Sequence, residues 1–332
     1  MEMKLFFYCM REFDELEIAR ECSQKYGIEF DYTTEYPSLE NAHLAAGADG
    51  ISFTPCDMSA LMVEAFAAQG VKYLCCHSIG YNHVDLARAH ALGLRVSNLS
   101  YPPSGVADFA IMLILMSLRQ LGHQLKRSEV QDYSLKGKMG RELPGTTVGV
   151  IGTGSIGSCV IEHLQGFGCP ILAYDPYPNP KLEGKCRYVS LDELLAQSEI
   201  ITLHCPVTPQ TTHILDREAF AKCRDGVILV NTARGALVDT SALIDALESG
   251  KVGAAGLDVL EEENGLYYYN RSGDVICNRQ MAILRSFPNV VLTPHTAFYT
   301  DLNVRSMVEG NFRSLYLMAS GQEDPHELKA DL

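Results

Sequence analysis

The sequence lacks the features that direct a chain to a membrane, to nucleic acid or out of the cell. Its most apolar stretch, Phe109–Leu118, is about half as long as the ~20 residues that span a bilayer, so we expect a buried helix there. The chain has 27 basic and 41 acidic residues, a formal charge of −14. Such an acidic surface repels phosphate backbones and anionic lipid heads, and we expect neither nucleic acid nor a membrane as a partner. The first residues, Met1–Lys4, lack the basic segment and cleavage site of an export signal.

The eleven cysteines lack the spacing of a disulfide framework or a metal site. Cys75 and Cys76 are adjacent, the others are scattered singly, and no Cys-x-x-Cys pair occurs. Several, such as Cys9 and Cys159, lie in apolar segments, which is typical of buried free thiols in a reducing compartment. We therefore predict a cytoplasmic protein that holds no metal ion.

Strand-like apolar runs alternate with helical runs along most of the chain, and two prolines at Ser100–Gly105 separate two blocks. We expect strands at Lys4–Tyr8, Ile28–Tyr32, Gly50–Phe53, Val71–Cys76 and Leu94–Asn98, then at Thr146–Ile151, Ile171–Tyr174, Ile200–His204, Val227–Asn231, Ala254–Asp258 and Val290–Thr293. Helices are expected at Asp14–Tyr26, Ser59–Gln69, Val106–Leu121 with Ser104 as its cap, Ser155–Phe167 and Thr300–Ala319. This alternation predicts parallel sheets in two α/β domains, residues 1–100 and 101–298, with a C-terminal helix in 299–332 returning to the first.

A glycine-rich turn, Gly152-Thr153-Gly154-Ser155-Ile156-Gly157, lies between an expected strand and an expected helix. In this context Gly152 permits the tight turn, Gly154 lets the backbone approach a pyrophosphate, and Gly157 lets helix and strand pack closely. The N–H groups around Ser155 and Ile156, at the positive end of the helix, are suited to bind phosphate. The turn therefore predicts a dinucleotide site, against the alternative of a glycine turn that merely packs.

A carboxylate at the end of the next strand indicates which dinucleotide binds. Asp175 lies 18 residues after Gly157 and can accept hydrogen bonds from the ribose hydroxyls of NAD, whereas it repels the 2′-phosphate of NADP. No arginine follows in residues 176–179 to offset that repulsion. NAD is therefore favoured over NADP.

Three later strand ends each carry a charged or titratable residue, Arg234, Glu263 and His295. Because the carboxyl ends of strands in a doubly wound sheet converge on the ligand crevice, these residues can meet there. Reduction of a 2-oxo acid needs an arginine fork for the carboxylate, a histidine as proton donor and a carboxylate that orients the histidine. Each residue also has a simpler interpretation: a strand-end salt bridge for Arg234, a solvated acidic run for Glu263 and a core histidine for His295.

Taken together, these residues resemble those of a known family, the D-specific 2-hydroxyacid dehydrogenases, and within it the D-lactate dehydrogenase branch, which includes the lactate-forming enzymes of vancomycin-resistance operons. The matching segments span nearly the whole chain in the family's order: Ser78–Asp85, Tyr101–Asp108, Val150–Gly157, Leu203–Pro206, Asn231–Gly235, Leu257–Val259 and Pro294–Thr300. The resemblance implies two doubly wound parallel-sheet domains, a flavodoxin-like substrate domain and a Rossmann NAD-binding domain, with a cleft between them.

The resemblance also implies roles for individual residues. Arg234 binds the substrate carboxylate and carbonyl, His295 is the acid and base, and Glu263 pairs with it. Further substrate contacts are implied for Ile79, Gly80, Tyr101 and Phe298. Contacts to the cofactor, beyond the glycine turn and Asp175, are implied for Cys205, Pro206, Thr211, Thr232, Ala233 and Asp258.

The chain departs from the family pattern in three places. His77 stands where many relatives have an arginine, so a second cation is not assured there. Asp108 shortens the acid that is more usually a glutamate. The insertion Asn264–Arg279, with a run of three tyrosines at 267–269, fits the D-lactate branch. The charge pattern of the sequence does not explain the tyrosine run.

These features predict NADH-dependent reduction of a small 2-oxo acid to the D-2-hydroxy acid, with pyruvate to D-lactate as the leading interpretation. A dehydrogenase for larger acids, such as 2-oxoisocaproate or phenylpyruvate, is the alternative. A scaffold that senses NAD, as in the C-terminal-binding-protein corepressors, is an alternative of another class, because those proteins share the fold and similar residues. Phosphoglycerate dehydrogenase fits less well because no regulatory domain follows residue 332. Relatives are homodimers joined through the cofactor domain, so a homodimer is expected, with Val106–Leu121 as the candidate interface.

Overall fold

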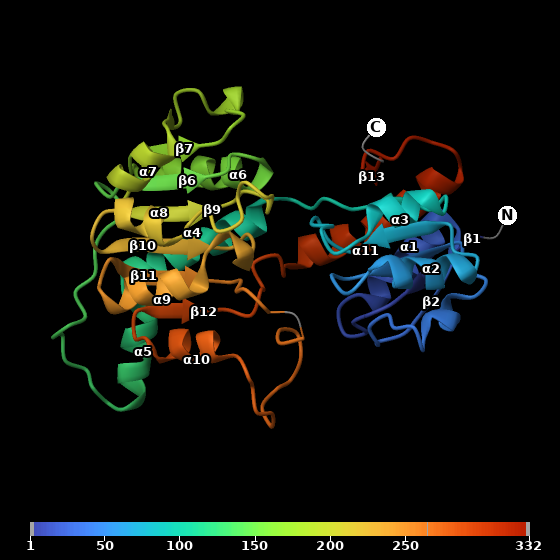
Figure 1. Ribbon diagram of the computed structural model, residues 1–332, viewed down its shortest axis with the longest axis horizontal. Helices are drawn as coiled ribbons and strands as arrows, with labels where there is room; N and C mark the ends of the chain where they lie inside the picture. Colours follow the sequence, from blue (N-terminus) through green and yellow to red (C-terminus); the bar gives the residue numbers. More distant parts are fainter. Residues whose placement is uncertain (1–2, 264, 330–332) are drawn as a thin grey trace. The chain divides into compact units, whose positions relative to one another are not determined.

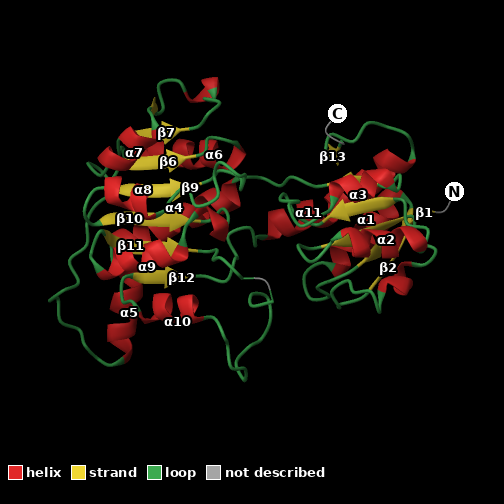
Figure 2. Ribbon diagram, in the orientation of Figure 1, coloured by secondary structure: helices red, strands yellow, loops and turns green. Residues whose placement is uncertain are grey.

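Short apolar runs separated by helices form two parallel sheets, each in its own part of the chain. The computed structural model describes residues 3–263 and 265–329. The chain divides into two compact units, of which unit 1 comprises Met1–Pro102 with Tyr299–Leu332 and unit 2 comprises Pro103–Phe298. Figure 1 labels most of the helices and strands, and Figure 2 shows the helices and strands in different colours.

Unit 1 is built on a six-stranded sheet in the order β13-β5-β4-β3-β1-β2. Its elements are β1 (Met3–Phe7), α1 (Leu16–Tyr26), β2 (Ile28–Tyr32), the 3-10 turn η1 (Ala42–Ala45), β3 (Gly50–Phe53), α2 (Ala60–Ala68), β4 (Tyr73–Cys76), α3 (Leu86–Ala91), β5 (Arg95–Ser97), α11 (Asp301–Ala319) and β13 (Glu327–Leu328). The first five strands are parallel, and β13 adds an antiparallel edge. The parallel strands follow the flavodoxin-like order.

The last helix of the chain completes the core of unit 1. Phe312 and Leu315 of α11 pack in one cluster with Leu5 and Phe7 of β1. Because successive residues of a strand face opposite sides of the sheet, Phe6 belongs to the cluster on the other face. Residues from both ends of the chain are therefore needed to bury β1.

Unit 2 is built on a seven-stranded parallel sheet in the order β12-β11-β10-β9-β6-β7-β8. Its strands are β6 (Val148–Ile151), β7 (Ile171–Tyr174), β8 (Arg187–Tyr188), β9 (Ile200–Leu203), β10 (Val227–Asn231), β11 (Val252–Leu257) and β12 (Val290–Leu292). Its helices are α4 (Ser104–Leu118), α5 (Leu121–Glu129), α6 (Ser155–Leu164), α7 (Leu191–Gln197), α8 (Arg217–Lys222), α9 (Thr240–Glu248) and α10 (Arg279–Ser286), with 3-10 turns η2 (Gln165–Phe167), η3 (Pro180–Leu182) and η4 (Gly235–Leu237). This is the Rossmann strand order with one strand added. From β6 the chain first adds strands on one side of the sheet and then, starting with β9, on the other, so the switch point lies between β6 and β9.

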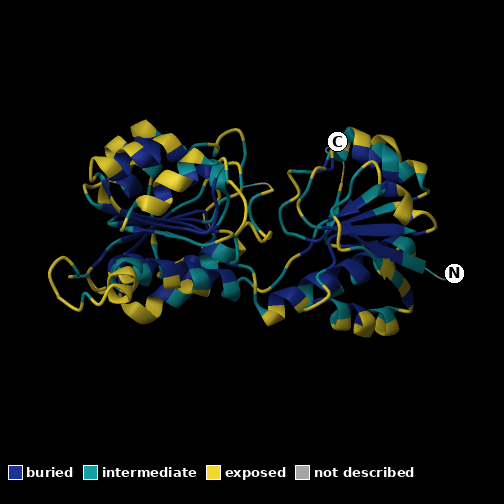
Figure 3. Cartoon of the chain, turned by 90° about the horizontal axis from the view of Figure 1, so that it is seen from below, coloured by how far each residue is buried: buried dark blue, intermediate teal, exposed yellow. Residues whose placement is uncertain are grey.

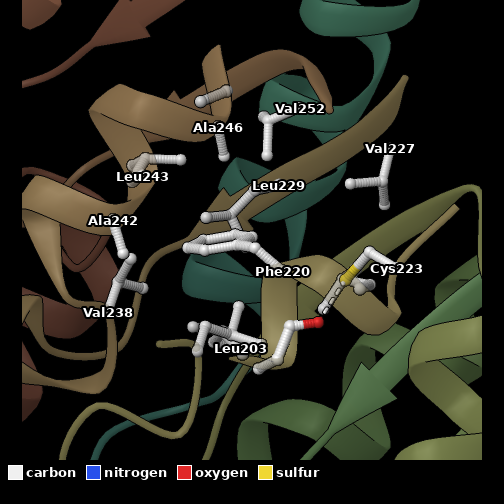
Figure 4. Packing of buried hydrophobic residues seen from close by; sticks show 14 of the residues in the cluster. Leu203, Phe220, Cys223, Val227, Leu229, Val238, Ala242, Leu243, Ala246 and Val252 are labelled. Atoms are coloured by element: carbon white, nitrogen blue, oxygen red, sulfur yellow. Dashed lines mark hydrogen bonds between the residues drawn. The ribbon is translucent and has the colours of Figure 1, made fainter. Parts of the chain in front are cut away.

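The central strands of unit 2 are covered on both faces. β6, β9 and β10 are buried along their whole length, as expected for a parallel sheet between two helix layers. Figure 3 shows the strands of each unit in dark blue and the outer faces of the helices in yellow. Figure 4 shows one of these layers, in which Phe220 of α8 packs among Leu203, Leu229 and Ala242. The two doubly wound parallel sheets predicted from the sequence are confirmed.

The prediction for the helix after the proline break is wrong at both ends. Ser104 is the first helical residue and not the cap, since Pro103 takes the cap position. The helix ends at Leu118, because Gln120 adopts a left-handed backbone with φ +51° and starts the separate helix α5. Within residues 3–263 and 265–329, no single helix has the length and hydropathy to cross a membrane; α4 and α5, bent by 64°, meet those criteria only when joined.

Candidate active site

The glycine turn joins β6 to α6, and its three glycines differ in their surroundings. Gly152 has φ +93°, and a Cβ there would lie 2.6 Å from the Cys205 nitrogen. A Cβ on Gly157 would lie 1.9 Å from the Gly152 carbonyl oxygen, whereas a Cβ on Gly154 would meet nothing within 4 Å. The fold itself therefore needs two of the glycines, and Gly154 borders open space from which a ligand can approach the backbone.

A cavity of about 590 Å³ opens beside this turn. Its lining includes Gly154, Ser155 and Cys159 on one side and residues 177–182 on the other. No side chain caps the start of α6, so the N–H groups of its first turn, including that of Ile156, are available for an anion at the positive end of the helix.

Asp175 follows β7 and is held by neighbouring donors. Its Oδ2 accepts hydrogen bonds from the Thr153 backbone nitrogen at 2.7 Å and from Thr153 Oγ1 at 3.2 Å. Its Oδ1 accepts one from the Tyr177 nitrogen at 2.9 Å. Tyr188 of β8 lies behind this arrangement and donates to Thr153 Oγ1 at 3.0 Å. The carboxylate is thus fixed beside the glycine turn, where a ribose hydroxyl can reach its remaining lone pairs.

The residues present fit a dinucleotide. Gly154 leaves room for a pyrophosphate, α6 presents its N-terminus, and Asp175 lies beside them. Directly after β10, the Thr232 hydroxyl is buried and has no hydrogen-bond partner among the described residues. A buried group of this kind is typical of a site completed by a ligand.

The segment after β9 lies directly against the glycine turn. The Cys205 backbone nitrogen approaches Gly152, and burial raises the pKa of its thiol to about 11. Thr211 Oγ1 donates to the Pro206 carbonyl at 2.6 Å and closes the loop that follows. Burial lowers the pKa of His204 to about 3, so this half-buried histidine is neutral at physiological pH.

His295 and Glu263 form a hydrogen-bonded pair beyond the ends of β12 and β11. His295 Nδ1 lies 2.6 Å from Glu263 Oε1, and Glu263 Oε2 accepts a hydrogen bond from the Leu260 nitrogen at 2.8 Å. Because a carboxylate only accepts, Nδ1 carries the proton and Nε2 faces away from the pair. The two side chains are 23% and 20% exposed. His295 is therefore no core histidine, and Glu263 is no freely solvated acid.

Asp258 holds the loop that carries His295. It is completely buried, and its Oδ1 accepts from Thr293 Oγ1 at 2.6 Å and from the Thr296 nitrogen at 2.9 Å. Its Oδ2 accepts from the Ala297 nitrogen at 2.8 Å. His295 itself has φ +54°, and its backbone nitrogen donates to the Asp258 carbonyl. Together these hydrogen bonds hold His295 in its strained backbone conformation. A contact of Asp258 with the nicotinamide half of the cofactor stays a prediction.

Arg234 follows β10, the strand next to β11. Its Nη1 donates to the Ala233 carbonyl at 2.7 Å, and Asn231 fixes the turn through the Ala233 nitrogen and the Arg234 carbonyl. In residues 3–263 and 265–329 no carboxylate forms an ion pair with Arg234. The guanidinium is therefore available for a carboxylate ligand. The simpler interpretation, that Arg234 forms a salt bridge at the strand end, is wrong as far as the described residues are concerned.

Comparison with known proteins agrees with this geometry. Residues 111–297 match the family described as D-isomer specific 2-hydroxyacid dehydrogenase, NAD binding domain. The chain belongs to this family. It is 42% identical to the aromatic 2-oxoacid reductase of Clostridium sporogenes (92% of this chain, 93% of the relative) and 36% identical to the D-lactate dehydrogenase of Escherichia coli (98% and 100%). The solved structure of D-2-hydroxyisocaproate dehydrogenase superposes with a TM-score of 0.89 at 34% identity, covering 99% of this chain and 100% of that one. The protein is thus an NAD-dependent D-2-hydroxyacid dehydrogenase.

Sequence reasoning missed the residues that brace the loops of this dehydrogenase. A Cβ on Gly235 would lie 2.0 Å from the Leu260 carbonyl carbon, so the Arg234 turn packs directly on the loop leading to Glu263. Glu261 accepts from His213 Nε2 at 2.6 Å and from Thr240. Burial acts to raise the pKa of Glu261, but Thr240 and His213 hold it below its usual value. Position within a run of three glutamates gave no signal of this role.

The tyrosine insertion of the dehydrogenase lies beside the His295 loop. Tyr268 donates to the His295 carbonyl at 2.9 Å, and its ring centroid lies 6.0 Å from that of His295 and 6.3 Å from that of Phe298. Tyr267 packs against the apolar cluster below, and burial raises its pKa. Tyr269 stacks under the Arg271 guanidinium at 5.1 Å. Asn264, with which the predicted insertion begins, lies outside the described residues.

The remaining predicted substrate residues belong to unit 1. Ile79 and Gly80 follow β4, where Ser78 Oγ donates to the Gly80 carbonyl at 2.6 Å and Asn98 donates to the Ile79 carbonyl at 2.7 Å. Tyr101 is half-buried at the end of the same unit. These bonds use carbonyls and leave the backbone N–H groups of the turn to a ligand.

His77, which precedes this turn, belongs to a buried network. Its Nδ1 accepts a hydrogen bond from Asn311 at 2.9 Å, so its Nε2 donates to Glu15 at 3.0 Å. Burial acts to raise the pKa of Glu15, but His77 and Arg11 hold it below its usual value. His77 is only 3% exposed and therefore supplies no accessible second cation.

Proposed function

We propose that this dehydrogenase reduces pyruvate to D-lactate with NADH. The observation that carries the proposal is the ring cluster of Tyr268, His295 and Phe298, because it places aromatic walls directly beside the acid–base candidate. Such walls favour a short substrate side chain. The 36% identity to the Escherichia coli D-lactate dehydrogenase over nearly the whole of both chains supports the same substrate.

In the proposed reaction three side chains act on the substrate. The Arg234 fork binds the carboxylate and polarises the carbonyl, since two parallel N–H donors match a carboxylate. Bound NADH supplies the hydride that the carbonyl carbon needs. His295 donates its Nε2 proton to the carbonyl oxygen, and Glu263 stabilises the charged ring that gives up this proton. Substrate contacts are proposed for Ile79, Gly80, Tyr101 and Phe298.

The cofactor is proposed to bind along the carboxyl edge of the unit 2 sheet. The N–H groups at Gly154, Ser155 and Ile156 bind the phosphates and Asp175 binds the ribose, with Gly152 and Gly157 shaping the turn. For the nicotinamide half the proposal includes Cys205, Pro206, Thr211, Thr232, Ala233 and Asp258.

The test is the initial rate of NADH oxidation with a series of 2-oxo acids. We expect kcat/KM for pyruvate to exceed the values for 2-oxobutyrate, 2-oxoisocaproate and phenylpyruvate, with D-lactate as the product. The 42% identity to an aromatic 2-oxoacid reductase favours phenylpyruvate as the second candidate. A higher kcat/KM for phenylpyruvate than for pyruvate would replace the first proposal by the second.

We also propose a cytoplasmic homodimer. The helix predicted as the interface, α4, buries Ala110, Leu113 and Ile114 inside unit 2 and leaves Met112 exposed on its other face, so its role in a dimer stays a prediction. A group of exposed apolar residues lies on α5 and the segment after it: Leu125, Val130, Tyr133, Leu135 and Met139. Light scattering should give the mass of a dimer, and Leu135→Asp should shift it towards the monomer. A monomeric wild type would contradict the proposed dimer.

The proposed cytoplasmic location is supported by the cysteines. All eleven are unpaired, which fits a reducing compartment.

A further inference from the structure

Three side chains on α4 and α6, with no role in the proposed reaction, form a hydrogen-bonded row that begins at the dinucleotide cavity. Cys159 Sγ lies 3.4 Å from His163 Nε2, and His163 Nδ1 lies 2.9 Å from Asp108 Oδ1. Because the carboxylate of Asp108 only accepts, it holds the proton on Nδ1 and leaves the Nε2 lone pair for the thiol. Nucleophile, base and orienting acid thus occupy the positions that an activated nucleophile needs.

The row is accessible and lies beside the dinucleotide cavity. The side chain of Asp108 is 71% exposed and that of His163 is 34% exposed. Cys159 is half-buried and lines the cavity with Gly154 and Ser155, one helical turn from the first N–H groups of α6. A group attached to Cys159 would therefore occupy space that the dinucleotide needs.

The reactivity of the Cys159 thiol depends on a neighbouring base that can remove its proton. Burial raises its pKa, and the carboxylates of Glu162 and Asp108 add to this. The thiol is therefore protonated at neutral pH, and a partner has to remove the proton before sulfur can attack. His163 is the group at Sγ that can do so.

We propose that Cys159 is a modification site for small disulfides and that the adduct blocks the binding of NADH. His163 Nε2 takes the thiol proton while Cys159 Sγ attacks one sulfur of the disulfide. The new S–S bond joins Cys159 to one half, the original S–S bond breaks, and the other half leaves as a thiolate that takes the proton from His163. One disulfide and one thiol are consumed, and one mixed disulfide and one thiol are formed. The proposal rests on NADH binding at the glycine turn, not on the identity of the 2-oxo acid.

The chain supplies a matched control thiol. Cys186 is also half-buried, and burial raises its pKa too, but its Sγ contacts the Leu182 carbonyl instead of a histidine. Cys277 is exposed, and Cys277→Ser serves as the background so that this thiol does not take up the reagent. Burial raises the pKa of Cys75 to about 12, and we expect it to stay unmodified.

The experiment treats the Cys277→Ser protein with glutathione disulfide and follows each cysteine-containing peptide by mass spectrometry. We expect Cys159 to react at least about a hundredfold faster than Cys186, the lower end of what a positioned base contributes. His163→Gln should bring Cys159 down to the rate of Cys186 and leave Cys186 unchanged, and Asp108→Asn should slow Cys159 less. Saturating NADH should protect Cys159.

Binding is measured separately, by NADH fluorescence titration of the modified and unmodified protein. We expect the adduct to raise the Kd of NADH about tenfold or more and dithiothreitol to restore it. Equal rates at Cys159 and Cys186, or a rate at Cys159 that His163→Gln leaves unchanged, would overturn the activation. An unchanged Kd in fully modified protein would overturn the block. Neither readout uses pyruvate turnover, so a different preferred substrate leaves this result unaffected, and failure of unmodified protein to bind NADH would count against the site itself.

Discussion

At the scale of single residues, Arg234 combines a charge with a fixed geometry. Its Nη1 is already tied to the Ala233 carbonyl, which orients the fork. We predict that Arg234→Lys lowers kcat/KM for pyruvate about a hundredfold, because a point charge replaces two parallel donors, while the Kd of NADH stays within about twofold. Steady-state kinetics and fluorescence titration measure the two effects. Arg217→Lys, at a largely exposed position on α8, is the control; equal losses in turnover and NADH binding would remove the assigned role.

The charge of Asp175 and the hydrogen bond that it accepts from the Thr153 side chain can be removed by two different substitutions. Asp175→Ala removes the repulsion of a 2′-phosphate, so the ratio of kcat/KM for NADH over NADPH should fall about tenfold or more. Thr153→Ala is the matched variant, since it removes the 3.2 Å bond from Oγ1 and keeps the carboxylate. This variant should leave the ratio nearly unchanged. An unaltered ratio in Asp175→Ala would mean that another residue discriminates between the cofactors.

At the scale of elements, we expect two glycines in the turn from β6 to α6 to have different roles: Gly157 is needed for the stability of the fold, and Gly154 for the binding of NADH. Gly157→Ala pushes a Cβ to 1.9 Å from the Gly152 carbonyl, so we predict a fall in Tm of several degrees, about 2–4 °C for each kcal/mol lost, together with weaker NADH binding. Gly154→Ala meets only open space and should lower NADH affinity with little change in Tm. Thermal melts without NADH and fluorescence titrations distinguish the two. A large drop in Tm for Gly154→Ala would show that this glycine serves the fold.

How far the sequence predicts an element depends on how local its cause is. The strand β6, the glycine turn and α6 follow from a continuous apolar run and from backbone rules, and they lie where expected. The edge strands β8 and β13 have two residues each, too few to show a period. The break before α5 depends on the left-handed backbone of Gln120, a residue that carries no turn signal.

The same reasoning applies to the candidate site. The pairing of Glu263 with His295 could be anticipated from the family resemblance, together with the expected convergence of the strand ends. The hydrogen bond from Tyr268 to the His295 carbonyl could not, because it depends on the path of an insertion without periodicity. Nor could the brace of His213 on Glu261, which joins residues 48 positions apart.

At the scale of the whole molecule, the two units differ in what they need from the rest of the chain. Unit 2 is continuous from Pro103 to Phe298 and contains its own core, so we predict that this fragment folds alone and binds NADH. It should not reduce pyruvate, because it lacks Ile79, Gly80 and Tyr101. Residues 1–102 alone should fail to fold, because Leu5 and Phe7 lose Phe312 and its neighbours on α11. Circular dichroism melts of both fragments, with NADH titration of the first, measure this. A cooperative melt of residues 1–102 would show that this part of unit 1 folds without α11, and an unfolded unit 2 fragment would show that its core depends on unit 1.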